Sequence, residues 1–431
     1  MWKRLVLGAV ALVLCATVAV LSGAAEKKQG QKKAKSAQAK AAEKEKEEAE
    51  AKWAPAVKPK PLGENVKRGL AWLVDHQLPS GVWGQGEESA QMRSGTEMKD
   101  VASVADTCSA ALALIRSGST PSKGPYAKNL LKAVDYVCSE IEGYDEDSLY
   151  ITSTRGTRLQ GKLGPYVDTF MASLMLSEVQ GNMPNKKSNK RVDRALDNVL
   201  EKLTKHQRSD GTWDDRGWAA TLSQGLAVKG LNRAAQQGKM VDEKVRQKAE
   251  QFSRKAFDRS TGKFSMPGSA GVELYAAGSN LGAVADSVNT NQAEEAEVRK
   301  AVKTAPTATE RQEAEAKLDR FAAAKQDLDE ATAAVVRRLD DKQFIAGFGS
   351  NGGEEFLSYM NIGEALVVKG GDEWKSWDKS ITENLDRIQN KDGSWTGHHC
   401  VTGRTFCTSA ALLVLMVDRT PVPIAAKIGR R

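Results

Sequence analysis

Along most of this chain, apolar residues recur with the spacing of an α-helix, in two kinds of segment that alternate. In the first kind, as in residues 192–203, apolar residues line one face and charged residues line the other. In the second kind, as in residues 406–416, almost every position is apolar or small. The first pattern is typical of a helix packed on one side, and the second of a helix buried on all sides. The chain is therefore predicted to be all-α, with an outer and an inner layer of helices.

Six segments of each kind can be traced between residues 64 and 416. The predicted outer helices are 64–77, 127–141, 190–206, 242–257, 308–341 and 374–389, and the predicted inner helices are 106–115, 168–176, 220–228, 272–284, 356–368 and 406–416. Such helix pairs stack into an open solenoid or close into a ring. Neither end carries a distinct polar capping repeat, which favours a closed α6/α6 toroid, or alpha-alpha barrel.

Residues 285–341 interrupt this alternation, because they are rich in Ala, Glu, Lys and Gln and contain a Pro at position 306. We predict an inserted helical hairpin with arms at 292–303 and 308–341, whose second arm becomes the outer helix of the fifth pair. Two interpretations remain for its apolar positions. The arms pack on each other, or they form a coiled-coil site for a partner.

A motif of the form Q-x-x-x-G-x-W occurs three times, each time at the end of a predicted outer helix. The Gln closes the helix, the Gly permits a turn with positive φ, and the Trp folds back onto the helix end. Recurrence at equivalent places indicates a repeat architecture. The copies comprise Gln77, Gly81 and Trp83, then Gln207, Gly211 and Trp213, then Gln389, Gly393 and Trp395.

The N-terminus has the pattern of an export signal. Lys3 and Arg4 precede an apolar run over residues 5–21, and small residues follow at 22–25. Residues 1–25 are therefore predicted to be a signal peptide, or an uncleaved N-terminal anchor. The protein would then be exported, whether periplasmic, cell-surface or secreted.

The remaining chain divides by composition. Residues 26–60 are Lys, Ala and Glu in low complexity and are predicted to form a disordered tether. Residues 61–418 hold the toroid, and 419–431 form a C-terminal tail. The net charge is +8, of which residues 1–25 carry +2 and residues 26–60 carry +5. The ring itself is nearly neutral, which argues against a nucleic-acid partner. Membrane contact is expected only through the N-terminal segment, although the basic tether is also suited to acidic wall polymers or anionic lipid.

Four cysteines follow the predicted signal, and an exported protein permits disulfides between them. Closure of the ring would bring the first and last helix pairs together, so that a disulfide between Cys108 and Cys407 becomes possible. Free buried thiols are one alternative. Another alternative is a zinc site formed by Cys108, Cys400 and Cys407 together with His398 and His399. We nevertheless predict no metal and no cofactor.

The repeated motif resembles the QW repeat of squalene-hopene and oxidosqualene cyclases, and the inner helices are similar to the repeats of the protein prenyltransferase β-subunit. The resemblance covers about residues 64–417 without the hairpin. It implies a terpenoid cyclase-like toroid, whose cavity opens where the inner helices begin. It also implies that the Gln and Trp residues of the motif are structural and tie the outer helices together.

The catalytic motifs of these families are incomplete in this chain. The cyclase motif D-x-D-D-T-A is reduced to Asp106 and Thr107, without the neighbouring carboxylates that create a strong acid. Asp168 is followed by a Thr in the same way, so helix N-capping is the favoured interpretation of both aspartates. Asp106 and Cys108 form the D-x-C unit of the zinc prenyltransferases, but the late histidines lie almost a whole domain away. The glycine-rich stretch 347–353 lacks the Lys of a phosphate loop and is interpreted as a loop at the cavity rim.

Two functions from different classes follow. The first is a toroid that binds a ligand or a protein partner at its mouth, without cyclase or zinc prenyltransferase chemistry. The alternative is an enzyme, either a terpenoid cyclase-like transferase or a polysaccharide-active enzyme with a carboxylate pair. Asp106 and Asp168 are weak catalytic candidates. The candidate ligand-binding residues at the rim are Trp218, Glu273, Tyr275, Glu355, Tyr359, His399 and Arg404. A deep, aromatic-lined pocket with a buried Asp would favour the cyclase, and a filled centre would favour the binding module.

Overall fold

The computed structural model describes residues 57–88, 98–144, 147–213, 216–349 and 351–421. The predicted signal segment, most of the tether and residues 422–431 lie outside this part, so their predictions are not tested. The described residues all belong to one compact unit, Pro55–Arg431. Within it, helices dominate, and a single described hairpin joins β1 (Phe257–Asp258) to β2 (Lys263–Phe264) in antiparallel register.

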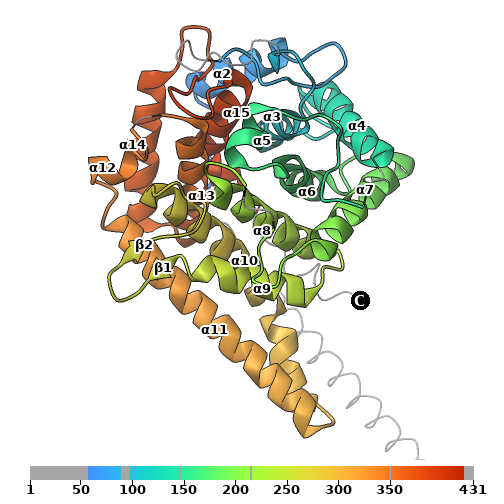
Figure 1. Cartoon of the computed structure of the whole chain (residues 1–431), viewed down its shortest axis with the longest axis vertical. Coiled ribbons are helices and arrows are strands. Elements are labelled where there is room, and N and C mark those ends of the chain that lie inside the picture. Colours follow the sequence, from blue (N-terminus) through green and yellow to red (C-terminus); the bar gives the residue numbers. More distant parts are fainter. Residues whose placement is uncertain (1–56, 89–97, 145–146, 214–215, 350, 422–431) are drawn as a thin grey trace, which may run out of the picture. The chain divides into compact units, whose positions relative to one another are not determined.

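Six inner helices form a closed ring, as Figure 1 shows. They are α3 (Val104–Arg116), α6 (Val167–Val179), α8 (Ala220–Gln236), α10 (Glu273–Thr304), α13 (Gly353–Lys369) and α15 (Arg404–Leu415). Each packs against the next in this order, and α15 returns to pack against α3. In α6 nearly every side chain is buried, as expected for a segment that is apolar on all sides. The predicted closed toroid is confirmed.

Six outer helices alternate with the inner ones along the chain and cover the ring. They are α2 (Glu64–Asp75), α4 (Ala127–Gly143), α7 (Lys186–Lys205), α9 (Glu243–Arg254), α11 (Ala308–Val336) and α14 (Gly371–Ile388). Each has one buried face, which in α7 consists of Val192, Ala195, Leu196, Val199, Leu200 and Leu203. The spacing of three or four residues places these side chains on one side of the helix. Short helices α5 (Arg158–Leu163), α12 (Lys342–Ile345) and η3 (Val417–Arg419) complete the described elements.

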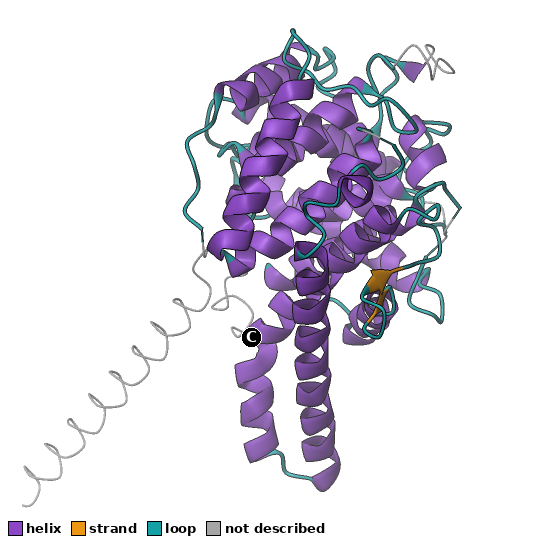
Figure 2. Cartoon of the chain, turned by 90° about the vertical axis from the view of Figure 1, so that its left-hand side faces the viewer, coloured by secondary structure: helices purple, strands orange, loops and turns teal. Residues whose placement is uncertain are grey.

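The inserted hairpin is present, but its first arm differs from the prediction. We expected a separate helix over 292–303, whereas α10 runs without a break from the ring into that arm. The reason is that this stretch consists of good helix formers, and the helix ends only before Pro306. Figure 2 shows α10 and α11 projecting together beyond the ring. The arms pack on each other through a small apolar cluster that includes Val288 and Ala324.

The three Q-x-x-x-G-x-W turns have the same geometry. In the second copy, the amide of Gln207 donates to the carbonyl of Gly211 in its own turn and to that of Val245 in the next outer helix, α9. The indole of Trp213 donates to Leu203 O at 2.8 Å. Gly211 has φ +93°, and a Cβ there would lie 2.2 Å from a backbone oxygen of α9. The other copies repeat these contacts, and the third links α14 to α2 across the closure of the ring.

Candidate functional site

Three of the predicted rim residues come together where the inner helices begin, the face that we call the mouth. Tyr275 lies at the start of α10, Glu355 at the start of α13, and His399 in the loop before α15. Glu354 lies beside them, and both glutamates have no exposed surface. We call Tyr275, Glu354, Glu355 and His399 the mouth cluster.

Each glutamate of the mouth cluster has one oxygen held by protein donors. Glu355 Oε1 accepts from the hydroxyl of Tyr275 at 2.6 Å and from the N–H of Phe348 at 3.1 Å. Its Oε2 lies 3.3 Å from Nε2 of His399. Glu354 Oε2 accepts from the N–H of Val401 at 3.1 Å, whereas its buried Oε1 has no hydrogen-bond partner among the described residues.

Burial sets the protonation of this cluster. It raises the pKa of Glu354 to about 8, and the neighbouring Glu355 carboxylate adds to the rise. Burial also raises the pKa of Glu355, while His399 and the hydroxyl of Tyr275 oppose that shift. The pKa of Tyr275 is raised, first by burial and then by the two carboxylates. The mouth cluster thus holds two buried acids opposite one imidazole, an unfavourable balance that the Lys162 charge offsets only in small part.

The glycine-rich stretch explains how the backbone comes so close to these acids. Gly347 has φ +61°, and a Cβ there would lie 2.5 Å from Glu355 Oε1. A Cβ at Gly352 would lie 2.8 Å from Glu355 Oε2 and 3.0 Å from Cε1 of His399. Both positions therefore require glycine, because any side chain would displace the carboxylate.

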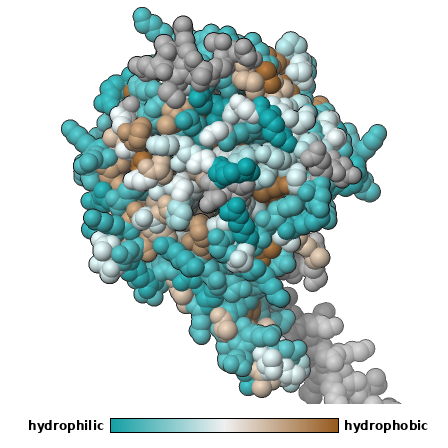
Figure 3. Space-filling model, viewed as in Figure 1, coloured by the Kyte–Doolittle hydropathy of each residue, from teal (hydrophilic) through white to brown (hydrophobic). Residues whose placement is uncertain are grey.

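Two exposed aromatic side chains lie beside the mouth cluster, and we call them the aromatic lip. Trp218 is 38% exposed and Phe348 is 50% exposed, and their ring centroids are 5.4 Å apart. The Phe348 ring is in turn 5.3 Å from the His399 ring. In Figure 3, apolar residues on this side of the ring are scattered among hydrophilic ones and form no broad apolar surface. An exposed pair of rings in such surroundings is a feature typical of a binding site.

The other predicted rim residues do not join the mouth cluster. Tyr359 is buried, and its hydroxyl donates to Ile345 O at 2.6 Å. Glu273 accepts from the N–H of Phe264 and pairs with an arginine of the segment after α11. Arg404 pairs with Asp392 at 2.8 Å, next to the third Q-x-x-x-G-x-W turn. These contacts hold neighbouring elements together.

The two aspartates differ from the expectation that each caps its own helix. Ser103 is the N-cap of α3, because its hydroxyl accepts from the N–H of Asp106. Both oxygens of Asp106 are buried and make no hydrogen bond to the described residues. Asp168 instead caps the neighbouring helix, since it accepts from the N–H of Ala105 at 2.9 Å and from Gln160 at 2.7 Å. Burial raises the pKa of Asp106 to about 7, although the nearby Ser103 hydroxyl opposes part of the shift.

The disulfide between Cys108 and Cys407 is absent, and the four described cysteines are free thiols. Cys407 donates to Val401 O at 3.3 Å, toward the loop that carries His399. Burial, followed by the Asp168 and Cys138 charges, raises the pKa of the Cys108 thiol.

Among the described residues, side chains fill most of the centre of the ring. Its narrow cavity has room for about one water. The lining is mostly apolar, with Ser109, Leu112, Arg116, Met171, Leu174, Leu226, Leu357, Met360, Glu364, Phe406, Ala410 and Leu413. No deep aromatic pocket with a buried Asp is found among the described residues, which was the feature expected of a cyclase.

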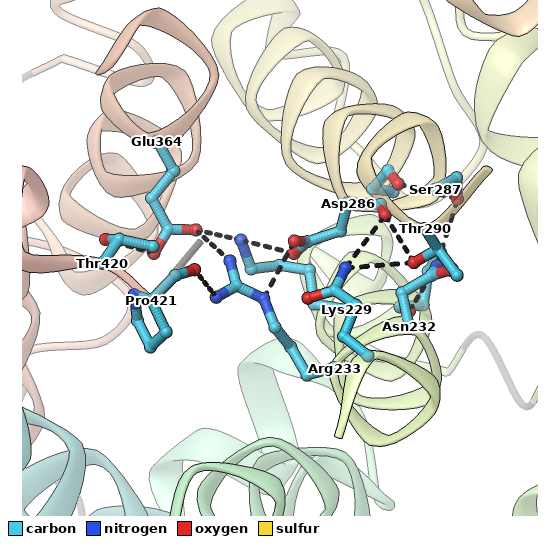
Figure 4. A network of polar contacts seen from close by, with 12 residues as sticks. Lys229, Asn232, Arg233, Asp286, Ser287, Thr290, Glu364, Thr420 and Pro421 are labelled. Carbon is cyan, nitrogen blue, oxygen red and sulfur yellow. Dashed lines mark hydrogen bonds and ion pairs between the residues drawn. The ribbon is translucent and has the colours of Figure 1, made fainter. Parts of the chain in front are cut away.

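A second buried polar cluster, which we call the base network, lies toward the C-terminal ends of several inner helices. Figure 4 shows its part around Lys229, Arg233, Asp286 and Glu364. Lys229 pairs with Glu364 and lies 3.3 Å from Asp286, and Arg233 lies 2.9 Å from Asp286. Arg116 pairs with Glu178 at 2.6 Å and approaches Glu364. The base network therefore comprises Arg116, Glu178, Lys229, Arg233, Asp286 and Glu364.

Sequence reasoning did not select Glu354 or the base network as sites. The signal for Glu354 is two adjacent acids at the start of a helix that is apolar on all sides, where neither acid can reach solvent. The signal for the base network is single charged residues within inner helices, such as Lys229 and Glu364. Their pairing could not be predicted, because 135 positions separate these two residues.

Comparison with known proteins found no family model and no curated protein that matches this chain. Similar solved structures include an inactive variant of the α-1,6-mannanase GH76A of Salegentibacter sp. HEL1_6 in complex with α-1,6-mannotriose. It is 10% identical, covers 83% of this chain and 98% of its own, and has a TM-score of 0.49. The type II terpene cyclase MstE from Scytonema is 13% identical, covers 82% and 96%, and has a TM-score of 0.45.

None of the described helices combines the length and the apolar character that are needed to cross a membrane.

Proposed function

We propose that the ring is a binding module of an exported protein, and that it takes an oxygen-rich ligand at its mouth. The observation that carries this proposal is the aromatic lip beside the mouth cluster. Trp218 and Phe348 offer apolar ring surface to solvent, and the buried carboxylates lie directly behind His399. A ligand with one flat apolar face and a polar edge, such as a sugar ring, matches this combination.

The filled centre supports binding over cyclisation. A cyclase must enclose a long hydrocarbon in a dry cavity and donate a proton to a weakly basic carbon. The cavity of this ring has room for about one water. Asp106 is buried, but its pKa of about 7 makes it a much weaker acid than an ordinary Asp. We therefore predict no cyclised product from squalene.

A second candidate is a polysaccharide-active enzyme that uses Glu354 and Glu355. Its support is that the two carboxyl groups have different surroundings: Glu355 is held by three neighbours, whereas Glu354 has one bonded and one unbonded oxygen. Unlike environments separate an acid from a base in glycosidases. Both groups are fully buried, however, so a polymer would reach them only after the backbone at Gly347 and Gly352 moves.

Tryptophan fluorescence tests the proposed function, because Trp218 is the one exposed tryptophan among the described residues. We expect soluble oligosaccharides from a panel to change this emission in a saturable manner. Trp218→Ala and Phe348→Ala, followed by calorimetry, should weaken binding at least about tenfold, the equivalent of ~1.4 kcal/mol.

Met240→Ala is the matched control, since Met240 is also an exposed apolar residue, at 80% exposure, and lies after α8, away from the lip. Equal affinity in Trp218→Ala and in the unmodified protein would contradict the proposal. Hydrolysis of an oligosaccharide that stops in Glu354→Gln would favour the enzyme instead.

A further inference from the structure

In the mouth cluster, one oxygen of each glutamate makes no hydrogen bond to the described residues, and the one of Glu355 has only the His399 imidazole beside it, at 3.3 Å. Glu354 uses Oε2 for the N–H of Val401, and Glu355 uses Oε1 for the hydroxyl of Tyr275. The remaining Glu354 Oε1 and Glu355 Oε2 accept no hydrogen bond from the described residues. A buried carboxylate oxygen without a donor is costly, so a missing partner is indicated at this point.

The separations in the cluster suit a metal ion. One ligand atom from each of Glu354, Glu355 and His399 lies within 4.8 Å of the others. Ligand atoms that share one Zn²⁺ at about 2.0–2.2 Å are about 3–4 Å apart. Glu355 Oε2 and His399 Nε2 already have this separation, at 3.3 Å. A carboxylate oxygen of Glu354 lies within the same 4.8 Å limit and is the third candidate ligand.

The electric charge at this place is also suited to a cation. Glu354 and Glu355 are consecutive, fully buried acids, and His399 is the one basic group in their immediate ligand set. Arg158 lies in the same region but is paired with Glu88 at 2.6 Å, and Lys162 opposes the rise of the Glu354 pKa only as the last and smallest of its causes. A dication would balance the two carboxylates, whereas in the base network arginine and lysine side chains already do so.

The contacts around the cluster are those of a supported metal site. The hydroxyl of Tyr275 and the N–H of Phe348 both donate to Glu355 Oε1, which turns Oε2 toward His399. The N–H of Val401 holds Glu354 in the same way. Outer donors of this kind orient carboxylate ligands in metalloproteins.

We propose that Glu354, Glu355 and His399 bind one first-row transition-metal dication, such as Zn²⁺ or Mn²⁺. Carboxylate and imidazole ligands together favour these ions over Mg²⁺ and Ca²⁺, which prefer oxygen ligands alone. Three protein ligands leave a position for water or for an oxygen of the bound ligand. The inference deepens the proposed function, because it supplies the reason why an oxygen-rich ligand is selected.

Calorimetric titration of the metal-free full-length protein with Zn²⁺ and with Mn²⁺ tests the inference, together with elemental analysis of the dialysed complex. We expect one equivalent per chain for at least one of the two ions. Glu355→Gln and His399→Ala should weaken binding at least about 100-fold, and Tyr275→Phe about tenfold, because it removes only an outer donor. Absence of a stoichiometric ion would overturn the proposal.

His398→Ala is the matched control, since it removes an adjacent, exposed histidine outside the ligand set. Loss of binding in this variant equal to that in His399→Ala would indicate surface binding and contradict the proposal. Circular dichroism establishes whether each variant is folded. If Glu355→Gln does not fold, His399→Ala still tests the proposal. With Co²⁺ as a probe, a sulfur-to-metal charge-transfer band would identify the nearby Cys400 as a ligand and overturn the assigned set.

Metal binding is measured with no saccharide present, so the two proposals can fail separately. Stoichiometric metal without any oligosaccharide binding would uphold the metal site and contradict the proposed function. Oligosaccharide binding without stoichiometric metal would uphold the proposed function and contradict the metal site. If both occur, removal of the metal by a chelator should weaken oligosaccharide binding at least about tenfold.

Discussion

The mouth cluster and the base network are both buried, and both use α10 and α13, yet they handle charge in opposite ways. The base network combines three cations with three anions, so its charges balance. Burial by itself would raise the pKa of Glu364, but Lys229 and Arg233 more than offset it, and the pKa lies well below its ordinary value. In the mouth cluster the pKa of Glu354 is raised instead, to about 8.

This difference separates a structural site from a candidate functional one. A balanced network needs nothing from outside the chain. Two buried carboxylates opposite one imidazole destabilise the fold unless one of them is protonated or a cation binds to them. The base network also binds the last described residue of the chain, because Arg233 donates to Pro421 O at 2.7 Å. Experiments that change one charge at a time can test whether the two clusters really differ in this way.

The largest effect is expected when the base network loses a cation. Lys229→Met leaves Asp286 and Glu364 partly unbalanced in a buried place, and should lower the free energy of unfolding by about 3–5 kcal/mol. Chemical denaturation measures this change. Lys239→Met is the control, since Lys239 forms a partly exposed pair with Asp197, which should contribute about 1 kcal/mol or less. A smaller loss for Lys229→Met than for Lys239→Met would contradict the comparison.

The next effect concerns pH and the unbalanced carboxylates on the mouth side. The pKa of Asp106 is raised from 3.8 to about 7 by burial. The unfolded chain therefore releases this proton above pH 3.8 and the folded chain only near pH 7, so Asp106 makes stability fall as pH rises through that window. Asp106→Asn should remove this fall, a relative gain of about 2–4 kcal/mol at pH 8 compared with pH 4.

Denaturation of both proteins at these two pH values measures the gain, and the other titrating groups cancel in the difference. If Asp106→Asn instead lost stability at pH 8 relative to pH 4, compared with the unmodified protein, Asp106 would be stabilised as the anion. The base network should lose stability as pH falls, not as it rises. The stability that Glu364 contributes is lost as the pH falls below 4.5, the ordinary pKa of a Glu side chain.

A smaller effect should follow from neutralising the mouth cluster. Glu354→Gln removes one of two adjacent buried acids, so in metal-free buffer at pH 9 it should raise the free energy of unfolding by about 1–3 kcal/mol. In saturating Zn²⁺ or Mn²⁺ the order should reverse, because only the unmodified protein gains binding free energy. Thermal melts with and without metal test both statements, and a destabilised variant in metal-free buffer would contradict the first.

The smallest effect is expected where the described chain ends. Thr420 donates to Glu364 Oε1 at 3.0 Å, but the cations of the base network already satisfy that carboxylate. Thr420→Val should therefore cost about 1 kcal/mol. A loss as large as that of Lys229→Met, measured by the same denaturation series, would mean that the chain end is essential to the base network.

The sequence by itself determined the ring, because helix periodicity and the Q-x-x-x-G-x-W turns are local. The face of α7 that carries Val192 and Leu196 is recognisable from spacing alone. Gly211 was predicted from its turn, and the structure adds that α9 leaves no space for a Cβ there. The continuous α10 was missed because no local signal separates a helix that leaves the ring from one that ends.

Only the tertiary structure decided the partners of each polar side chain. Asp168 caps α3 and not its own helix, since a carboxylate bonds to whichever N–H groups lie closest in space. Cys108 and Cys407 stand on adjacent helices, but they form no disulfide, and the Cys407 thiol donates to Val401 O instead. Glu355 meets Tyr275 across 80 positions and His399 across 44, which no periodicity encodes. The candidate site follows from the closure of the ring, because closure places distant side chains within contact distance.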